Sequence, residues 1–249
     1  MAELIEIQTS DGTAEAYLAR PEEGVEVKGG VLFFMDAIGL RPRIAEMVDR
    51  IASWGYIVLA PNVFYRWGTA EELEPKGSLM DPESRAAFFA SGVMDRVNGL
   101  TSDLAAVDTV AYVATLQSYV GPELPLATTG YCMGARLAIR AAGQFPGVVV
   151  AVAGFHGGGL VTDAPDSPHT VVTGEATYLF GHADNDGSMT PENAATLDAA
   201  LTAAGATFTS AIYPGSPHGY SMTDTSSYDE AGEQRHWAEL EPFLAETLG

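Results

Sequence analysis

The sequence predicts an α/β fold in which a mainly parallel sheet is flanked by helices. Continuous apolar runs such as 30–35 and 56–60 fit strands that are buried on both faces, and they alternate with helical patterns such as 103–119. This alternation is typical of parallel sheets, because each parallel connection needs a crossover segment. The 249 residues contain no linker, repeat or low-complexity tract, so we expect one domain spanning 1–249.

The first part of the chain predicts a hairpin, a buried strand and a helix before the strand at 56–60. Alternating apolar residues over 4–19 favour a hairpin with its turn at Asp11-Gly12. Apolar residues at helical spacing after Pro42 favour an amphipathic helix that stops near Gly55. The stretch 66–100 mixes Glu, Pro and Gly with apolar residues. There we expect a loop with one or two short helices, arranged as a cap over the site.

The second part predicts strands and helices in regular alternation. Strands are expected at 124–129, 147–155, 176–181 and 206–213, and helices at 103–119, 135–142, 191–204 and 233–248. The strands are short and apolar, whereas the helices repeat their apolar residues at helical spacing. The carboxyl ends of such strands meet at one edge of the sheet, where open α/β proteins bind their ligands.

The charge and the cysteine content exclude several classes of protein. A formal net charge of −21 argues against nucleic-acid binding, since few basic side chains are present to replace phosphate counterions. The acids are scattered, which is typical of a solvated surface. A single cysteine excludes an intrachain disulfide framework and a multi-cysteine zinc site.

The chain shows no sign of a secretory or membrane segment. Its start, MAELIEIQTSDG, lacks the basic and apolar regions of a signal peptide, and no apolar run approaches the roughly 20 residues that span a membrane. We therefore expect a cytoplasmic protein without a membrane or nucleic-acid partner. A monomer and a small homo-oligomer are both compatible with the sequence.

The most informative motif is Gly130-Tyr131-Cys132-Met133-Gly134. It follows a predicted strand and opens a predicted helix, which is the setting of a nucleophile elbow, G-x-Nuc-x-G. Cysteine stands where serine is usual, and Cys132 is the only cysteine in the chain. A lone cysteine is often an inert buried residue, but this context favours a nucleophile next to the N-terminus of a helix.

A base and an acid follow in the order found in α/β-hydrolases. His218 comes after the strand at 206–213, and Asp184 comes after the strand at 176–181. We therefore predict that Cys132, Asp184 and His218 form a catalytic triad. Asp186 is a close rival of Asp184, with a role in turn formation as its alternative. Asp184 is favoured because it lies nearer the strand end.

The remaining histidines are competitors for the base. His156 and His182 follow strands and are expected to line the site, whereas His169 lies in a polar loop and His236 in the closing helix. His156-Gly157-Gly158-Gly159 looks like the oxyanion motif of esterases, but that motif should precede the nucleophile. We interpret it as a flexible loop at the edge of the site.

The loop Asp36-Ala37-Ile38-Gly39 occupies the position proper to an oxyanion loop, directly after the strand at 30–35. The backbone N–H groups of Ala37 and Met133 are expected to hold an oxyanion together. Asp36 would bring a carboxylate near the thiol and is a candidate activating group. A capping or loop role is its alternative.

These motifs resemble those of the dienelactone hydrolase family of α/β-hydrolases, from Val31 to the final helix. The resemblance rests on Gly-Tyr-Cys-Met-Gly at 130–134, Gly-His-Ala-Asp at 181–184 and Pro-His-Gly-Tyr at 217–220. It implies an α/β-hydrolase fold and a Cys-Asp-His triad that acts on esters and lactones. The archetype of the family converts dienelactone to maleylacetate.

Two positions depart from that archetype. Its oxyanion loop carries a glutamate that deprotonates the cysteine, and the matching residue here is Asp36. It also binds the substrate carboxylate with arginines, one of them at the position of Met222. Candidate substitutes are Arg41, Arg43, Arg66 and Arg85. As candidate substrate-binding residues we take His156, Tyr220 and Arg85.

The sequence thus predicts a hydrolase of small carboxylic esters or lactones that works through a thioester on Cys132 and needs no metal or organic cofactor. Two alternatives stay open. One is an inactive small-molecule-binding module on the same fold. The other is a thiol-regulated redox protein, which the lack of a resolving cysteine disfavours.

Overall fold

Eight strands form one sheet in the computed structural model, which describes residues 1–249. The strand order is β1-β2-β4-β3-β5-β6-β7-β8. The strands are β1 (Glu3–Thr9), β2 (Gly12–Ala19), β3 (Gly29–Phe34), β4 (Tyr56–Pro61), β5 (Leu126–Tyr131), β6 (Val149–Phe155), β7 (Thr177–Ala183) and β8 (Thr207–Tyr213).

The sheet is parallel except at one edge. β1 pairs with β2, and β2 with β4, in antiparallel fashion, whereas every pair from β4 to β8 is parallel. The predicted hairpin is present, but Gly12 already pairs with Thr9, so the turn consists of Ser10 and Asp11. The predicted α/β class with a mainly parallel sheet is confirmed.

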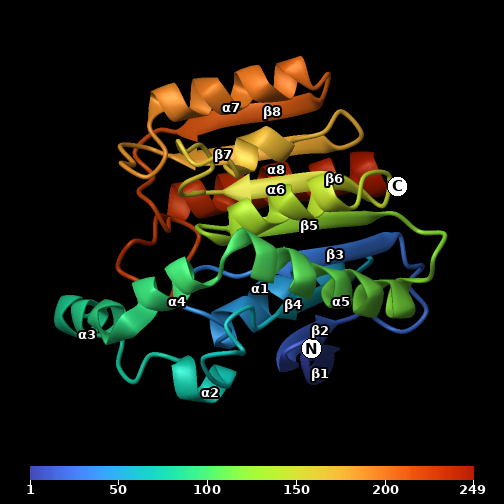
Figure 1. The fold of residues 1–249 in the computed structure, drawn as a ribbon. Coiled ribbons are helices and arrows are strands. Elements are labelled where there is room, and N and C mark those ends of the chain that lie inside the picture. The colour runs from blue at the N-terminus through green and yellow to red at the C-terminus, as the bar shows by residue number, and fades with distance from the viewer.

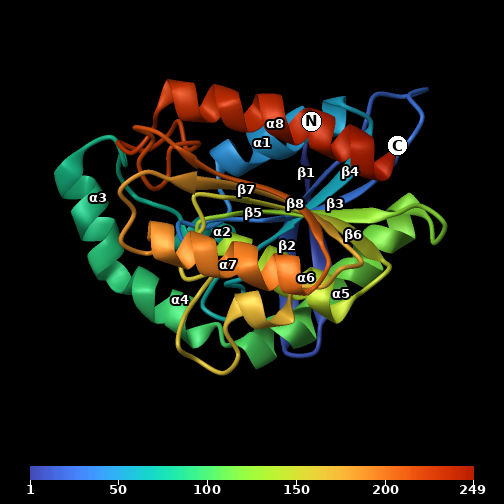
Figure 2. The same ribbon diagram turned by 90° about the horizontal axis from the view of Figure 1, so that it is seen from above.

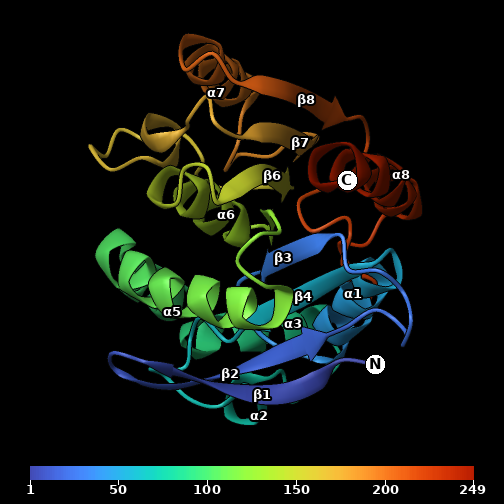
Figure 3. The same ribbon diagram turned by 90° about the vertical axis from the view of Figure 1, so that its right-hand side faces the viewer.

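Helices cover both faces of the sheet. α1 (Pro42–Ser53) and α8 (Glu230–Leu248) lie on one face, and α5 (Ser102–Val120), α6 (Gly134–Gln144) and α7 (Pro191–Ala203) lie on the other (Figures 1 and 2). Figure 3 shows the sheet between these two layers. None of the helices combines the length and apolar character needed to cross a membrane.

The helix starts follow from local sequence. Thr101, Thr190 and Asp229 each accept a hydrogen bond from a backbone N–H in the first turn of the helix that follows. Such caps satisfy amides that have no partner within the helix, and each contributes about 1 kcal/mol. Pro42 and Pro191 begin their helices, where a missing N–H costs nothing.

The cap segment, residues 66–100, is more helical than predicted. It contains α2 (Ala70–Leu73), α3 (Pro82–Phe88), the irregular turn η1 (Phe89–Val93) and α4 (Met94–Gly99), and Figure 1 shows α3 and α4 projecting past one end of the sheet. Capping contacts at Thr69 and Asp81 start the first two helices. Gly92 has a φ of 94°, so it lets the chain kink between α3 and α4.

The central strands give the site a rigid base. Every residue of β3, β4 and β5 is buried. These strands belong to a cluster of 63 buried apolar residues that spans both helical layers. Close packing of this kind resists displacement of the backbone at the strand ends, where the candidate site lies.

Candidate active site

Cys132 occupies a strained turn between β5 and α6. Its φ is 55°, in the left-handed region. Residues other than glycine rarely adopt this region, and doing so costs roughly 1–3 kcal/mol. Both flanking glycines are required by close approach. A Cβ on Gly130 would lie 2.2 Å from the carbonyl oxygen of Gly134, and one on Gly134 would lie 2.3 Å from that of Phe34. The predicted elbow is therefore present, with Cys132 at its tip.

Tyr131 anchors this turn from below. Its ring is fully buried and stacks between Phe33 and Phe155, with ring centroids 4.8 and 5.6 Å away. Its hydroxyl lies 2.9 Å from Nε2 of His236, on α8. His236 thus serves packing, and it ties the elbow to the opposite helical layer.

A chain of hydrogen bonds joins the thiol to a histidine and a carboxylate. Cys132 Sγ lies 3.0 Å from His218 Nε2, and His218 Nδ1 lies 2.6 Å from Asp186 Oδ2. Burial lowers the pKa of His218, but the hydrogen bonds with Asp186 and Cys132 outweigh burial and raise it to about 10. At neutral pH the imidazole is therefore protonated.

The carboxylate beside His218 is that of Asp186 and not that of Asp184, which the sequence favoured as the acid. Asp184 instead accepts a hydrogen bond from the backbone N–H of Gly215, at 2.8 Å, and thereby holds the turn that precedes His218. Asn185, in the turn between the two aspartates, has a φ of 53°, in the left-handed region. Both features depend on backbone conformation, which nearness to the strand end did not capture.

Asp186 is held firmly in its position. Its side chain is only 5% exposed. Its second oxygen accepts hydrogen bonds from the backbone N–H and the hydroxyl of Ser188. Burial raises the pKa of this carboxyl, but the hydrogen bonds from His218 and Ser188 outweigh burial and lower it below its usual value. The carboxylate therefore stays charged beside the imidazolium.

The loop after β3 and the elbow after β5 each contribute one amide without a hydrogen-bond partner to the lining of the same cavity. Ala37 and Met133 line one cavity together with Cys132. Neither backbone N–H donates a hydrogen bond within the protein. An amide that faces a cavity without a partner is available to an anionic oxygen.

Asp36 orders this loop and does not contact the thiol. Its two oxygens accept hydrogen bonds from Arg41 at 2.7 and 2.9 Å, and one of them also accepts from the N–H of Ile38. Arg41 in turn binds Asp224. Burial lowers the pKa of Arg41, but its two carboxylate partners raise it above its ordinary value. The structure thus matches the alternative that sequence left open for Asp36, a role in the loop.

A cavity of about 450 Å³ opens above Cys132. The cap segment and the loops after the strands enclose it. Its lining includes Cys132, His218, Asp36, Ala37, Met133, His156, Met222, Arg85, Phe89, Met94, Val97, Asn98 and Arg136. No group of three or more His, Cys, Asp or Glu side chains is arranged to hold a metal ion.

The candidate substrate-binding residues differ in position. Arg85 and His156 line the cavity. Tyr220 does not, because it is fully buried and donates its hydroxyl hydrogen to the carbonyl oxygen of Gly181. His156 is also buried, with Nε2 2.8 Å from the Ser221 hydroxyl and its ring against that of His218. Burial, reinforced by His218, holds the pKa of His156 well below its usual value.

Other predicted cations and histidines lie away from the cavity. Arg41, Arg43 and Arg66 are each paired with carboxylates, and His182 contacts the Ser210 hydroxyl. Arg136 was not among the site residues predicted from the sequence, although it lies in the first turn of α6, directly after the elbow, and lines the cavity.

Comparisons with known proteins show the family to which the chain belongs. The family model described as "Dienelactone hydrolase family" matches residues 14–248. The chain is 27% identical over 239 residues to a putative carboxymethylenebutenolidase of Salmonella typhi, covering 94% of this chain and 83% of that protein. A protein of the same description from Synechocystis is 26% identical, with 98% and 96% covered.

Solved structures show the same fold. A putative dienelactone hydrolase of Klebsiella pneumoniae superimposes with a TM-score of 0.81 at 21% identity, covering 99% of this chain and 98% of that one. A dienelactone hydrolase-like promiscuous phosphotriesterase, P91, from metagenomic libraries gives 0.75 at 17% identity, with 100% and 99% covered.

The raised pKa of His218 predicts a measurable titration. In the wild-type protein the imidazole should lose its proton near pH 10, and the stabilisation from its contacts should be lost as the pH rises through that value. Asp186→Asn removes the charged acceptor and should lower this pKa. NMR of the imidazole nitrogens checks the shift, with Asp184→Asn as the matched control. Equal shifts in both variants would contradict the pairing with Asp186.

Proposed function

Because the chain belongs to the dienelactone hydrolase family, we propose that it hydrolyses small carboxylic esters or lactones through a covalent thioester on Cys132. The observation that carries this proposal is the chain of contacts Cys132–His218–Asp186 at the floor of a cavity. A nucleophile, a base and a carboxylate that orients the base are the parts that acyl transfer requires.

Acylation begins when the substrate carbonyl lies above Cys132. The proton of the thiol already resides on Nε2 of His218, and the sulfur attacks the carbonyl carbon. The carbonyl oxygen becomes an oxyanion held by the N–H groups of Ala37 and Met133, which have no other partner. Asp186 keeps the imidazolium oriented and stabilises its charge.

The intermediate then collapses to a thioester. The C–O bond of the ester breaks, and His218 returns its proton to the leaving alkoxide. In a lactone the same step opens the ring, and the alcohol remains attached to the acyl group. A water molecule, deprotonated by the now neutral His218, attacks the thioester. The second tetrahedral intermediate releases the carboxylic acid and restores Cys132.

The remaining parts of the site serve positioning. The Asp36–Arg41 pair holds the oxyanion loop in place, so that the amide of Ala37 is preorganised before the substrate arrives. The Asp184–Gly215 hydrogen bond fixes the turn before His218. Residues of the cap segment, such as Phe89 and Val97, give the cavity an apolar wall for the acyl or alcohol group.

Removal of the thiol tests the nucleophile. Cys132→Ala should abolish hydrolysis of a chromogenic short-chain ester, while the thermal unfolding curve stays close to that of the wild type. Prior alkylation of the wild-type thiol should have the same effect. Undiminished turnover by Cys132→Ala would rule out the thioester route.

Substitution of Asp186 and of Asp184, one at a time, tests which of the two aspartates orients His218. Asp186→Asn should lower kcat by about 10²- to 10⁴-fold, since it no longer stabilises the imidazolium. Asp184→Asn keeps an acceptor for the Gly215 amide and should lose far less. Steady-state kinetics on the same ester make the comparison. A larger loss in Asp184→Asn would reverse the assignment.

A further inference from the structure

Arg136 is a cation without a partner in the wall of the catalytic cavity. It lies on α6, and its guanidinium makes no hydrogen bond or ion pair within the protein. Arg140, one turn further along the helix, binds Asp166. A guanidinium has five N–H donors, and none of the Arg136 nitrogens is among the buried atoms that lack a partner, so these donors are open to the cavity. The pKa of Arg136 is lowered from its ordinary value, mainly because the side chain is partly buried. Cys132 opposes this shift, and the charge of Arg140 adds to it.

A second cavity of about 250 Å³ adjoins the first at this arginine. The residues that line both cavities are Val97, Asn98, Met133, Arg136 and Gly159. The second cavity is more polar, with hydroxyl groups from Thr101, Ser102, Thr162 and Ser167 in its lining. Arg136 therefore stands at the junction of the catalytic cavity and a polar extension of it.

The glycine loop that the sequence analysis assigned to the edge of the site runs along this junction. A Cβ on Gly158 would lie 3.5 Å from His218 Cε1, and one on Gly159 would lie 3.7 Å from Arg136 Cδ. Gly159 also has a φ of 66°, which favours glycine. The loop thus passes from the catalytic base to Arg136 without side chains that would narrow the space between them.

The charges at the catalytic cavity favour an anion. Its lining includes two arginines, Arg85 and Arg136, and one carboxylate, Asp36. Asp36 is already neutralised by Arg41. The cavity therefore has uncompensated positive charge in a chain whose formal net charge is −21. An anionic group on the substrate would satisfy the free donors of Arg136 with charge-assisted hydrogen bonds.

We propose that Arg136 binds a carboxylate or phosphate group of the ester substrate, and that the second cavity holds the polar arm that bears this group. The inference rests on the proposed esterase function and extends it to substrates longer than a single-ring lactone. In the archetype of the family, an arginine at the position of Met222 binds the substrate carboxylate. The proposal places anion binding at Arg136 instead, on α6.

Matched pairs of esters test the proposal. One pair is a 4-nitrophenyl monoester of a dicarboxylic acid and the 4-nitrophenyl alkanoate of equal chain length. The other is the acetyl ester of glycerol phosphate and the acetyl ester of glycerol. The wild-type enzyme should prefer the anionic member of at least one pair, and the preferred pair identifies a carboxylate or a phosphate as the ligand.

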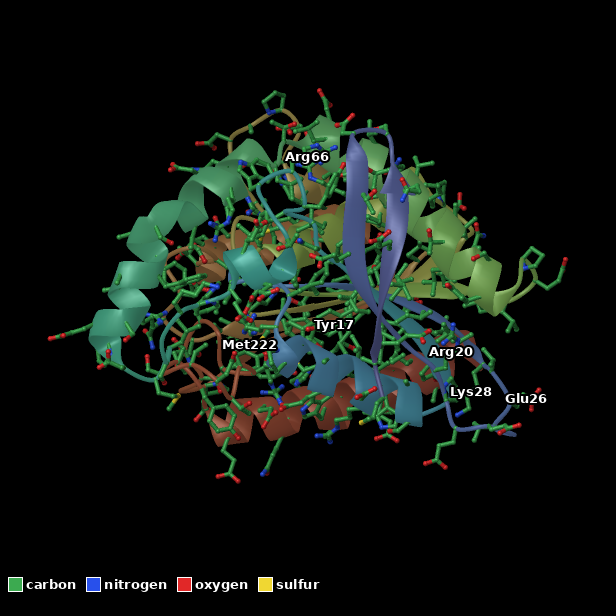
Figure 4. All side chains as sticks on the ribbon, turned by 90° about the horizontal axis from the view of Figure 1, so that it is seen from below. Tyr17, Arg20, Glu26, Lys28, Arg66 and Met222 are labelled. Atoms are coloured by element: carbon green, nitrogen blue, oxygen red, sulfur yellow. The ribbon has the colours of Figure 1, made fainter.

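Substitution of Arg136 should remove this preference. Arg136→Gln should lower kcat/KM for the preferred anionic ester by about 10- to 100-fold and should lower that for the neutral partner far less. Arg136→Lys should retain part of the preference. Arg20→Gln is the matched control, because it removes the same charge at the end of the molecule away from Met222, as Figure 4 shows.

Two results would overturn the inference. One is wild-type enzyme that hydrolyses the neutral and anionic members of both pairs equally well. The other is an Arg136→Gln variant that loses activity toward both members alike, which would indicate a structural role. In either case hydrolysis of the neutral esters that depends on Cys132 would leave the proposed function standing. Failure of the wild-type enzyme to hydrolyse any ester would instead contradict the proposed function itself.

Discussion

The close approach of β5, α6 and β3 at the elbow is the constraint on which the site depends. Gly130 packs against the backbone of Gly134, and Gly134 against that of Phe34, at distances that exclude any side chain. Cys132, between these two glycines, has a left-handed conformation and stands in the turn after β5, where it lines the cavity. Tyr131, clamped between two phenylalanine rings, keeps the strained turn from relaxing.

The three carboxylates near the sulfur each bind a different partner and therefore have different roles. Asp186 binds His218, and Asp184 accepts a hydrogen bond from the backbone of the turn that precedes His218. Asp36 binds Arg41. Each carboxylate near the site therefore has a partner within the protein, and each fixes a group whose position matters for acyl transfer. Arg136 differs because its guanidinium has no partner. The catalytic groups are thus fixed by contacts within the protein, whereas the guanidinium of Arg136 is free to bind a substrate.

Local patterns were enough to predict most of the fold and the elbow. The motif around Cys132 and the position of His218 follow from spacing along single strands and turns, so sequence identified both. The choice between Asp184 and Asp186 depends on the φ of Asn185 and on the amide of Gly215, which are set by tertiary structure. Tyr220 was misassigned because burial depends on how β7 and β8 pack, and the short helices of the cap segment have only weak periodicity.

The central claim is that Cys132 carries the acyl group during turnover. Intact-mass analysis of enzyme quenched shortly after mixing with an ester tests it most directly, followed by peptide mapping of the modified protein. The account predicts a mass increase equal to the acyl group, located on the peptide that contains Cys132 and released on further incubation. Rapid hydrolysis without an adduct, or an adduct on another residue, would contradict it.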